Sequence, residues 1–419
     1  MTADGDRLIP LSADDAPHFT WTRRTPVRKI VDALEAARRH CARFVGGCVR
    51  DSLIGAAPKD IDIATSLTPQ DVIDALHKAG LKAAPTGVAH GTVTGVADHV
   101  GIEITTLRAD VSTDGRRATV AFTEDWATDA RRRDFRLNAI YLTTDGKLFD
   151  PVGGLADARA GRVRFIGAPE DRIREDYLRI LRFFRFSARF AGGFDAEGLA
   201  ACAAFRDGIK RLSAERVGDE FTRILALPRA ALAVDAMAAT GVLGEVWPAK
   251  ADRETLRALK TFDPEASAPL GLAALWGEAG AGIDSALRLS NADSGRRKRA
   301  LNAAALLSLS VSERTQRQTL YRIGAEAWRD GAALAAARAG GGEGWAALRA
   351  FPDRWTAPAF AYTGKDIIAT GIERGPQVAK ILRAVEEAWI AEDFPPTERL
   401  REILGEKCGD RDSGLGTRD

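Results

Sequence analysis

The sequence predicts an α+β fold, with an N-terminal head of mixed sheet and helices followed by an all-helical neck, body and tail. Three observations favour this fold. Helix-like and strand-like segments alternate from about residue 26 to 165. Beyond about residue 170 the strand-like runs cease, and Ala, Leu, Arg and Glu recur with helical periodicity. Glycine or proline interrupts this helical half near Pro228, Gly271 and residues 340–342, which divides it into several helices.

These changes along the chain predict five segments. They are a flexible leader (1–25), the head (26–165), a helical neck (166–228), a helical body and tail (229–405) and a disordered C-terminus (406–419).

Within the head, the pattern predicts short elements that follow one another closely. The helix 69–79 has the clearest start, because Thr68 can cap it and Pro69 suits its first position. The other expected helices are 27–39 and one directly after the glycine turn at 46–47, and the expected strands are 43–45, 60–64, 91–96, 102–107 and 139–142.

The composition excludes several classes of protein. Hydrophobic residues make up 45% and charged residues 28%, as in ordinary globular proteins. No apolar run approaches the roughly 20 residues that cross a bilayer, and no signal-peptide pattern opens the chain, so we expect a cytoplasmic protein. The four cysteines form no CxxC pair, which argues against a disulfide framework or a thiolate zinc site. All five histidines lie in the first quarter, which excludes a His-Asp phosphohydrolase further along.

The charge is unevenly distributed. The whole chain carries a net charge of only +2. Residues 131–190 nevertheless hold 14 Lys or Arg against 8 Asp or Glu. Such a local excess of positive charge attracts polyphosphate or an RNA backbone.

The densest group of polar residues follows a glycine turn. Residues 44–51 read FVGGCVRD, and Asp60 and Asp62 come shortly afterwards. Residues two apart on a strand point to the same face, so these two carboxylates should lie together and repel each other unless a hard cation such as Mg²⁺ lies between them. The turn lets backbone N–H groups approach phosphate, and Arg50 can reach the same oxygens. The arrangement is typical of metal-assisted phosphoryl transfer.

This combination resembles the opening motif of the class II polymerase-beta-like nucleotidyltransferases, the family of tRNA CCA-adding enzymes and bacterial poly(A) polymerases. The resemblance implies a polymerase-beta-like head. It also implies that Asp60 and Asp62 are catalytic ligands of Mg²⁺ and that Gly47 and Arg50 bind the nucleotide. Glu103, on a strand-like run, is either a third acid of the site or the partner of an arginine.

A second cluster, RRRDFRLNA at 131–139, is similar to the RRDFTINA motif of the same family and departs from it at Arg136 and Leu137. The resemblance implies that Arg133 contacts the nucleotide and that Asp134 contacts the ribose 2′-OH. From the residues alone, a solvated run of charge is the alternative.

The third cluster is REDYLRILRFFRF at 174–186. If it is a single helix, Asp176, Arg179 and Arg182 lie on one face, because they are spaced three residues apart. A stripe of salt bridges is the alternative to a binding site. Cytosine and adenine both offer an amine beside a ring-nitrogen acceptor, which one carboxylate and one guanidinium can bind, whereas uracil and guanine would leave polar groups unpaired. The cluster resembles the EDxxR motif of the family. This implies that Asp176 and Arg179 bind the base, with Arg182 and Arg185 on the triphosphate or base.

Taken over residues 40–230, the resemblance implies template-independent, Mg²⁺-dependent transfer of CMP and AMP from CTP and ATP to the 3′ end of tRNA, with the body and tail binding tRNA. The sequence leaves open whether the protein adds the full CCA, only CC or only A. A poly(A) polymerase is the alternative within the family, but residues 86–93, TGVAHGTV, resemble the CCA-adding type. An alternative of another class is a non-catalytic RNA-binding protein on this fold, which the two intact carboxylates disfavour.

Overall fold

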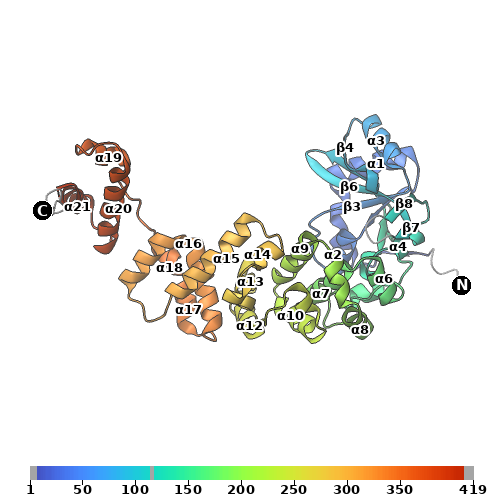
Figure 1. Ribbon diagram of the computed structural model, residues 1–419. Helices are drawn as coiled ribbons and strands as arrows, with labels where there is room; N and C mark the ends of the chain where they lie inside the picture. Colours follow the sequence, from blue (N-terminus) through green and yellow to red (C-terminus); the bar gives the residue numbers. More distant parts are fainter. Residues whose placement is uncertain (1–6, 114–117, 410–419) are drawn as a thin grey trace. The chain divides into compact units, whose positions relative to one another are not determined.

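The computed structural model describes residues 7–113 and 118–409. The chain divides into two compact units, Met1–Ala249 with Ser285–Arg288 and Lys250–Asp284 with Leu289–Asp419. In the described residues all strands belong to the first unit, and the second unit is built of helices (Figure 1). The predicted α+β class, with a mixed-sheet head and a helical remainder, is confirmed.

Eight strands of the head form one sheet in the order β1-β10-β9-β2-β3-β6-β5-β4, and β7 pairs with β8 in a separate ribbon. β3 runs parallel to β6, whereas the other neighbours in the sheet are antiparallel. The strands are β1 (Leu8–Pro10), β2 (Ala42–Val45), β3 (Asp62–Thr65), β4 (Lys82–Gly87), β5 (Thr92–Ala97), β6 (Val100–Thr106), β7 (Arg108–Thr113), β8 (Ala118–Phe122), β9 (Tyr141–Thr143) and β10 (Lys147–Phe149).

Two helices, α1 (Thr25–Ala37) and α3 (Pro69–Lys78), pack on each other and on β5. Gly95 of β5 admits this close packing, because a Cβ there would come within 3.3 Å of side-chain atoms from both helices. A capping box starts α3, since the hydroxyl of Thr68 accepts from the backbone N–H of Asp71. This confirms the start predicted for the helix 69–79.

The expected loose leader is not what residues 8–25 form. β1 pairs with β10 at the sheet edge, and a 3-10 helix, η1 (Ala16–Arg23), follows. Phe19 and Trp21 of η1 are buried, and the indole N–H of Trp21 donates to the hydroxyl of Ser52 at 2.8 Å. Burying two large aromatic rings offsets the entropy cost of ordering a polar segment. Residues 1–6 lie outside the described residues.

Beyond the sheet, an aromatic cluster joins the head to helix α7 (Leu178–Phe190). Phe135 and Phe165 lie 5.0 Å apart between ring centroids, and Phe186 of α7 lies 5.3 Å from Phe135. This packing fixes the segment 131–139 against α7. The other helices of the first unit are α2 (Gly47–Leu53), α4 (Trp126–Arg131), α5 (Gly154–Arg159), α6 (Pro169–Glu175), α8 (Ala196–Ala204), α9 (Ala214–Leu225), α10 (Ala230–Ala239) and α11 (Val242–Val246).

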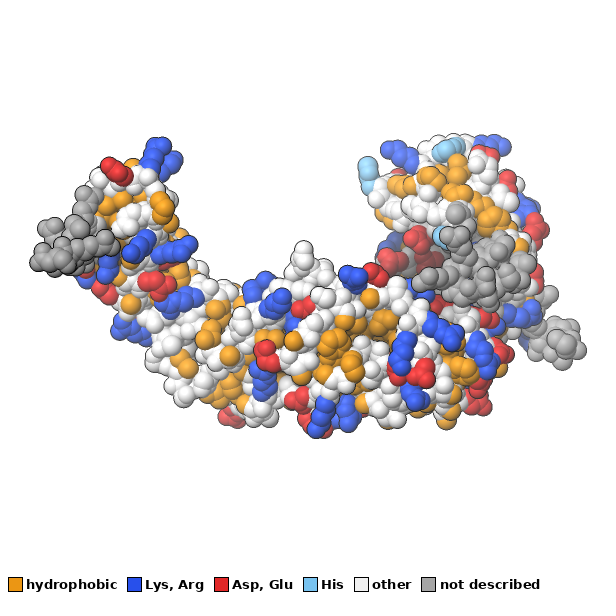
Figure 2. Space-filling model, in the orientation of Figure 1, with side chains coloured by type: hydrophobic (Ala, Val, Ile, Leu, Met, Phe, Trp, Pro, Cys, Tyr) orange, Lys and Arg blue, Asp and Glu red, His pale blue; other side chains and the backbone are white. Residues whose placement is uncertain are grey.

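The second unit continues with helices only, within the residues described. Positive and negative side chains are interspersed over its surface on the face drawn in Figure 2. None of the helices in the described part of the chain has the length and apolar character needed to span a membrane. The α-helices of the second unit are α12 (Arg253–Phe262), α13 (Ala268–Trp276), α15 (Asn291–Leu306), α16 (Glu313–Arg338), α17 (Glu343–Arg349), α18 (Phe351–Arg354), α19 (Gly364–Ala369), α20 (Pro376–Ala391) and α21 (Thr397–Gly409). The short helix α14 (Ile283–Ala286) is divided between the two units.

The C-terminal segment expected to be disordered, 406–419, is partly helical. Residues 406–409 belong to α21, whose buried Leu400 and Ile403 join a cluster with Trp389 of α20. Residues 410–419 lie outside the described part of the chain.

Candidate functional site

One cavity of the first unit, about 690 Å³ in volume, is lined by every residue that the three motifs single out. The lining residues come from the glycine turn and α2, from the loop before β3 and its first residue, from residues 132–138, from Asp176 between α6 and α7, and from α7 and α9. Those predicted from the sequence are Gly47, Arg50, Asp60, Asp62, Arg133, Asp134, Asp176, Arg179, Arg182 and Arg185.

The glycine turn forms part of the cavity wall. Gly46 has φ +74°, a conformation that favours glycine, and Gly47 starts α2 directly after it. Arg50, one turn further, is buried and donates to Asp51 at 2.6 Å and to the side-chain oxygen of Asn138 at 2.6 Å. Arg50 is therefore held in place, with its guanidinium on the cavity wall.

The acidic pair does not lie on one strand as expected. β3 begins at Asp62, so Asp60 belongs to the loop before it, although both residues line the cavity. Asp62 aligns with Glu103 across the parallel β3–β6 pair. Burial, then the charge of Glu103 and that of Asp60, outweigh the opposing charge of Arg133 and raise the pKa of Asp62 to about 6. Glu103 is thus an acidic neighbour of Asp62 but does not line the cavity, and both interpretations of it from the sequence stay open.

This repulsion is what a bound cation would relieve, and an all-oxygen donor set suits a hard divalent ion. In the described residues no group of three or more His, Cys, Asp or Glu side chains is arranged to hold a metal ion. A cation between Asp60 and Asp62 would therefore take its remaining ligands from water or from phosphate oxygens. The residues present fit that kind of shared site.

The buried carboxylate of Asp129 forms ion pairs with both Arg132 and Arg133. Asp129 of α4 accepts from Arg132 at 2.6 Å and from Arg133 at 3.0 Å, and both arginines line the cavity. Asp134, which follows Arg133 in the sequence, has other partners. Its Oδ2 accepts from Arg182 at 2.8 Å, and its Oδ1 accepts from the amide of Asn138 at 3.0 Å.

The third motif is not a single helix. α6 ends at Glu175 and α7 begins at Leu178, so Asp176 lies in the break with φ −156° and ψ 106°. Its Oδ1 accepts from the backbone N–H of Leu178 at 3.1 Å, and its Oδ2 accepts from Arg216 at 2.7 Å. The expectation that Asp176, Arg179 and Arg182 share one helical face is therefore wrong, although all three reach the cavity.

Arg179 and Arg185 have acidic partners of their own. Arg179 donates to Glu175 at 2.6 Å and to the backbone carbonyl of Arg132 at 3.2 Å. Arg185 is paired with Glu220, a buried residue of α9. Each guanidinium is thus oriented before any ligand binds.

Sequence reasoning missed the contribution of α9. Arg216, Glu220 and Arg223 are spaced by four and three residues, so they share a helical face, and the two arginines line the cavity. That spacing was visible in the sequence, but no motif pointed to it.

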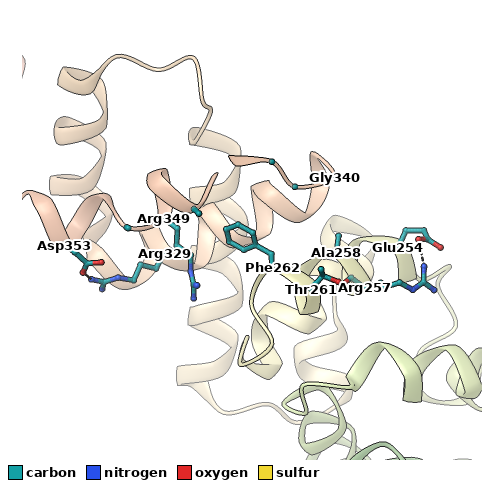
Figure 3. Close-up of a pocket in the computed structure, with 13 residues that line it drawn as sticks. Glu254, Arg257, Ala258, Thr261, Phe262, Arg329, Gly340, Arg349 and Asp353 are labelled. Atoms are coloured by element: carbon teal, nitrogen blue, oxygen red, sulfur yellow. Dashed lines mark hydrogen bonds and ion pairs between the residues drawn. The ribbon is translucent and has the colours of Figure 1, made fainter. Parts of the chain in front are cut away.

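A larger cavity of about 890 Å³ lies in the second unit (Figure 3). It contains neither an acidic pair nor a motif from the head. Its three arginines each have a carboxylate partner, namely Arg257 with Glu254, Arg329 with Asp353, and Arg349 with Asp263. Size alone therefore does not make it the functional site, and the smaller cavity of the first unit is the better candidate.

Comparison with known proteins agrees with this geometry. The family model described as the Poly A polymerase head domain matches residues 42–164, and the one described as the probable RNA and SrmB-binding site of polymerase A matches residues 194–252. The mixed-sheet head that carries the glycine turn and the acidic pair is thus similar to the head domain of poly A polymerases.

Over these two regions the chain is similar to poly A polymerases and to proteins named CCA tRNA nucleotidyltransferase. It is 44% identical over 201 residues to the mitochondrial CCA tRNA nucleotidyltransferase 1 of Mus musculus, covering 47% of this chain and 46% of that protein. It is 39% identical over 187 residues to the CCA-adding enzyme of Leuconostoc mesenteroides, covering 44% and 45%. The match spans about half the length of these relatives.

The similarity in structure covers more of the chain than the similarity in sequence does. The Bacillus stearothermophilus CCA-adding enzyme in complex with CTP superposes with a TM-score of 0.76 and 27% identity, covering 91% of this chain and 98% of that one. The Thermotoga maritima CCA-adding enzyme complexed with tRNA shares the fold, with a TM-score of 0.63 and 20% identity over 90% of this chain and 94% of that one.

Proposed function

We propose that this protein adds CMP and AMP, from CTP and ATP, to the 3′ end of tRNA without a nucleic-acid template, and so builds or repairs the CCA terminus. The observation that carries the proposal is the cavity itself. It brings together a pair of carboxylates, a glycine turn, six arginines of the motifs, and Asp176, which together with Arg179 suits the edges of cytosine and adenine. Relatives named as CCA-adding enzymes support the same activity.

The chemistry needs a divalent metal, and we propose Mg²⁺ held by Asp60 and Asp62. When bound, the ion would stabilise the charge that develops on the phosphate oxygens during nucleotidyl transfer. The protein's own part is to place the triphosphate beside these carboxylates. Arg50, Arg133 and the N–H groups after Gly46 would bind its oxygens, and the hydrogen bonds that already hold the two arginines would limit the reorganisation needed.

Base selection would rest on Asp176 and Arg179. Asp176 is paired with Arg216 and Arg179 with Glu175, so neither group is left as an uncompensated charge. A cytosine or adenine edge can take hydrogen bonds from this pair, since its amine donates and its ring nitrogen accepts. A uracil or guanine edge presents the reverse pattern and would leave polar groups unpaired in the cavity.

Asp134 is proposed to bind the ribose 2′-OH. Arg182 and Arg185, held by Asp134 and Glu220, would contact the triphosphate or the base. The helical second unit is proposed to bind the tRNA, through its shape and backbone rather than its sequence, as is usual for double-stranded RNA.

A single assay tests the activity. The protein is incubated with Mg²⁺ and with tRNAs that lack three, two or one of the terminal nucleotides, each with one labelled nucleotide at a time. We expect CMP on the two shorter tRNAs and AMP on the longest. Incorporation restricted to one of these steps would identify a CC-adding or an A-adding enzyme.

The alternative activities predict other results. A poly(A) polymerase would extend short oligo(A) primers into long tails with ATP alone, whereas the proposed enzyme would require a tRNA acceptor stem and T arm. A non-catalytic RNA-binding protein would bind tRNA and incorporate nothing. The expected cytoplasmic location stays a prediction, since similar proteins of mouse and human are named as mitochondrial.

A further inference from the structure

A carboxylate outside the three motifs has an unusual number of partners. Asp129 of α4 is buried, with only 1% of its surface exposed. Its Oδ1 accepts from Nε and Nη2 of Arg132 at 2.9 and 2.6 Å and from the backbone N–H of Arg108 at 3.1 Å. Its Oδ2 accepts from Nη2 of Arg133 at 3.0 Å and from the hydroxyl of Tyr141 at 2.7 Å. All the hydrogen-bonding capacity of this carboxylate is used.

The partners of Asp129 keep it ionised. Burial alone would raise its pKa, but the charges of Arg133 and Arg132, together with the hydrogen bond from Tyr141, lower the pKa to about 2. Tyr141 also accepts from Nε of Arg133 at 3.2 Å. Two guanidinium groups therefore share one carboxylate and one hydroxyl, and a net positive charge remains at the cavity wall.

The two arginines connect Asp129 to other parts of the site. A Cβ placed on Gly46 would lie 3.8 Å from Nη1 of Arg133, so this guanidinium stands at the glycine turn. The carbonyl of Arg132 accepts from Arg179. A substitution of Asp129 would therefore alter the position of the Arg133 guanidinium at the glycine turn and of the Arg132 backbone that binds Arg179.

We infer that Asp129, supported by Tyr141, is a positioning residue for the triphosphate, because it fixes Arg132 and Arg133 in the orientation in which they face the cavity. The inference rests on the proposed function, since it names the nucleotide as the ligand. Asp129 does not itself line the cavity. It acts through the two guanidinium groups, and the part of the ligand it affects is the phosphate chain rather than the base.

The test compares the affinities for CTP and CMP, measured by titration calorimetry with Mg²⁺ on the full-length protein. CMP lacks the two outer phosphates, so the ratio of the two affinities isolates the contribution of the phosphate-binding arginines. We expect the wild type to bind CTP more tightly. Asp129→Asn should reduce that ratio about tenfold, through loss of charge-assisted hydrogen bonds, and should leave CMP binding nearly unchanged.

A matched control separates this role from simple loss of a buried ion pair. Asp330 of α16 is likewise buried and is held by Arg296 at 2.6 and 3.0 Å, in the other unit. Asp330→Asn should lower the melting temperature without changing the CTP-to-CMP ratio. If Asp129→Asn does not fold, Tyr141→Phe keeps the carboxylate and should reduce the ratio about threefold.

The outcomes are distinct. A folded Asp129→Asn with the wild-type ratio, or an unchanged ratio in Tyr141→Phe where the first variant does not fold, would overturn the inference. A wild type that binds CTP and CMP equally would overturn it too, since the arginines would then not bind the outer phosphates. The proposed function fails by a different result, namely no nucleotide incorporation into any of the shortened tRNAs.

Discussion

Arg182 and Asp134 form an ion pair that joins α7 to the head, with Nε 2.8 Å from Oδ2. The pair is part of a longer chain of contacts. Asp134 also accepts from Asn138, and the side-chain oxygen of Asn138 accepts from Arg50. Groups from all three sequence motifs are therefore connected before the nucleotide arrives. Such preorganised donors require little rearrangement at the moment of reaction.

The first prediction concerns sugar selection by Asp134. Asp134→Ala removes the proposed acceptor of the ribose 2′-OH and leaves Arg182 without its partner. We expect the preference for CTP over dCTP in single-nucleotide addition to fall roughly tenfold, with a loss of about 1–3 kcal/mol in the free energy of unfolding. Asp134→Asn keeps one oxygen for Arg182 and is the control for stability. An unchanged CTP-to-dCTP preference in the alanine variant would assign Asp134 a structural role only.

The second prediction concerns the acidic pair. Asp60→Ala and Asp62→Ala should each abolish nucleotide transfer, because each removes a proposed ligand of the metal. Binding of tRNA should remain close to that of the wild type in a filter-binding assay, since the helical unit is proposed to hold the RNA. A variant that keeps more than about a tenth of the wild-type rate would contradict the assignment of that residue as a metal ligand.

A third prediction follows from the raised pKa of Asp62, about 6 against an ordinary 3.8. The folded protein holds this proton more tightly than the unfolded chain. The contribution of Asp62 to stability is therefore fully present below pH 3.8 and is lost as the pH rises through about 6. In EDTA, Asp62→Asn should be more stable than the wild type at pH 8, by at most about 3 kcal/mol, and the advantage should shrink toward pH 4.

Urea denaturation at three pH values measures this difference directly. Adding Mg²⁺ at pH 8 should stabilise the wild type by mass action and should stabilise Asp62→Asn less. An advantage of the variant that does not change with pH would show that repulsion at Asp62 is not its cause.

The location of the site could be predicted because its polar residues occur in short motifs. The turn at Gly46, the pair Asp60 and Asp62 and the arginines at 133 and 179 are all recognisable from local spacing. The structure places all of them around one cavity. Asp129 was not found in the same way. Its spacing to Arg132 and Arg133 is local, but the sequence shows neither its burial nor its hydrogen bond with Tyr141, twelve residues away.

The break at Asp176 was missed for a similar reason. Neither glycine nor proline separates α6 from α7, so the sequence resembles one continuous helix. The break is stabilised by contacts from distant residues. Tyr177 packs on Gly208, where a Cβ would lie 1.9 Å from its ring, and Arg216 binds Asp176. The short strands β1 and β10 were also missed, since these three-residue strands depend on a partner that the local pattern does not reveal.

The fourth prediction concerns Arg216, which the motifs do not include. Arg216 orients Asp176 from α9 at 2.7 Å, and both side chains are partly exposed. Arg216→Ala should change the free energy of unfolding by less than about 1 kcal/mol, as for other exposed pairs. It should nevertheless weaken the preference for CTP and ATP over UTP and GTP about threefold, because the acceptor loses its orientation.

Arg174→Ala is the matched control for this variant. Arg174 pairs with Asp171 at 2.8 Å, with both side chains exposed, and it does not line the cavity. Its removal should leave nucleotide preference unchanged. An equal effect of the two substitutions would mean that Arg216 acts on general stability or charge rather than on Asp176.

The last prediction is that nucleotide choice resides in Asp176 and Arg179. Removing either group leaves one side of the base edge unpaired, which costs about 1–3 kcal/mol, or roughly five- to a hundredfold in selectivity. Asp176→Asn is more informative, because an amide can donate as well as accept, and its oxygen can still accept from Leu178 or Arg216. Uracil and guanine, which present carbonyls, should then be incorporated better relative to cytosine and adenine. Single-nucleotide addition with all four nucleotides measures this directly. An equal loss for all four, with the preference unchanged, would mean that Asp176 only links α6, α7 and α9 through its bonds to Leu178 and Arg216.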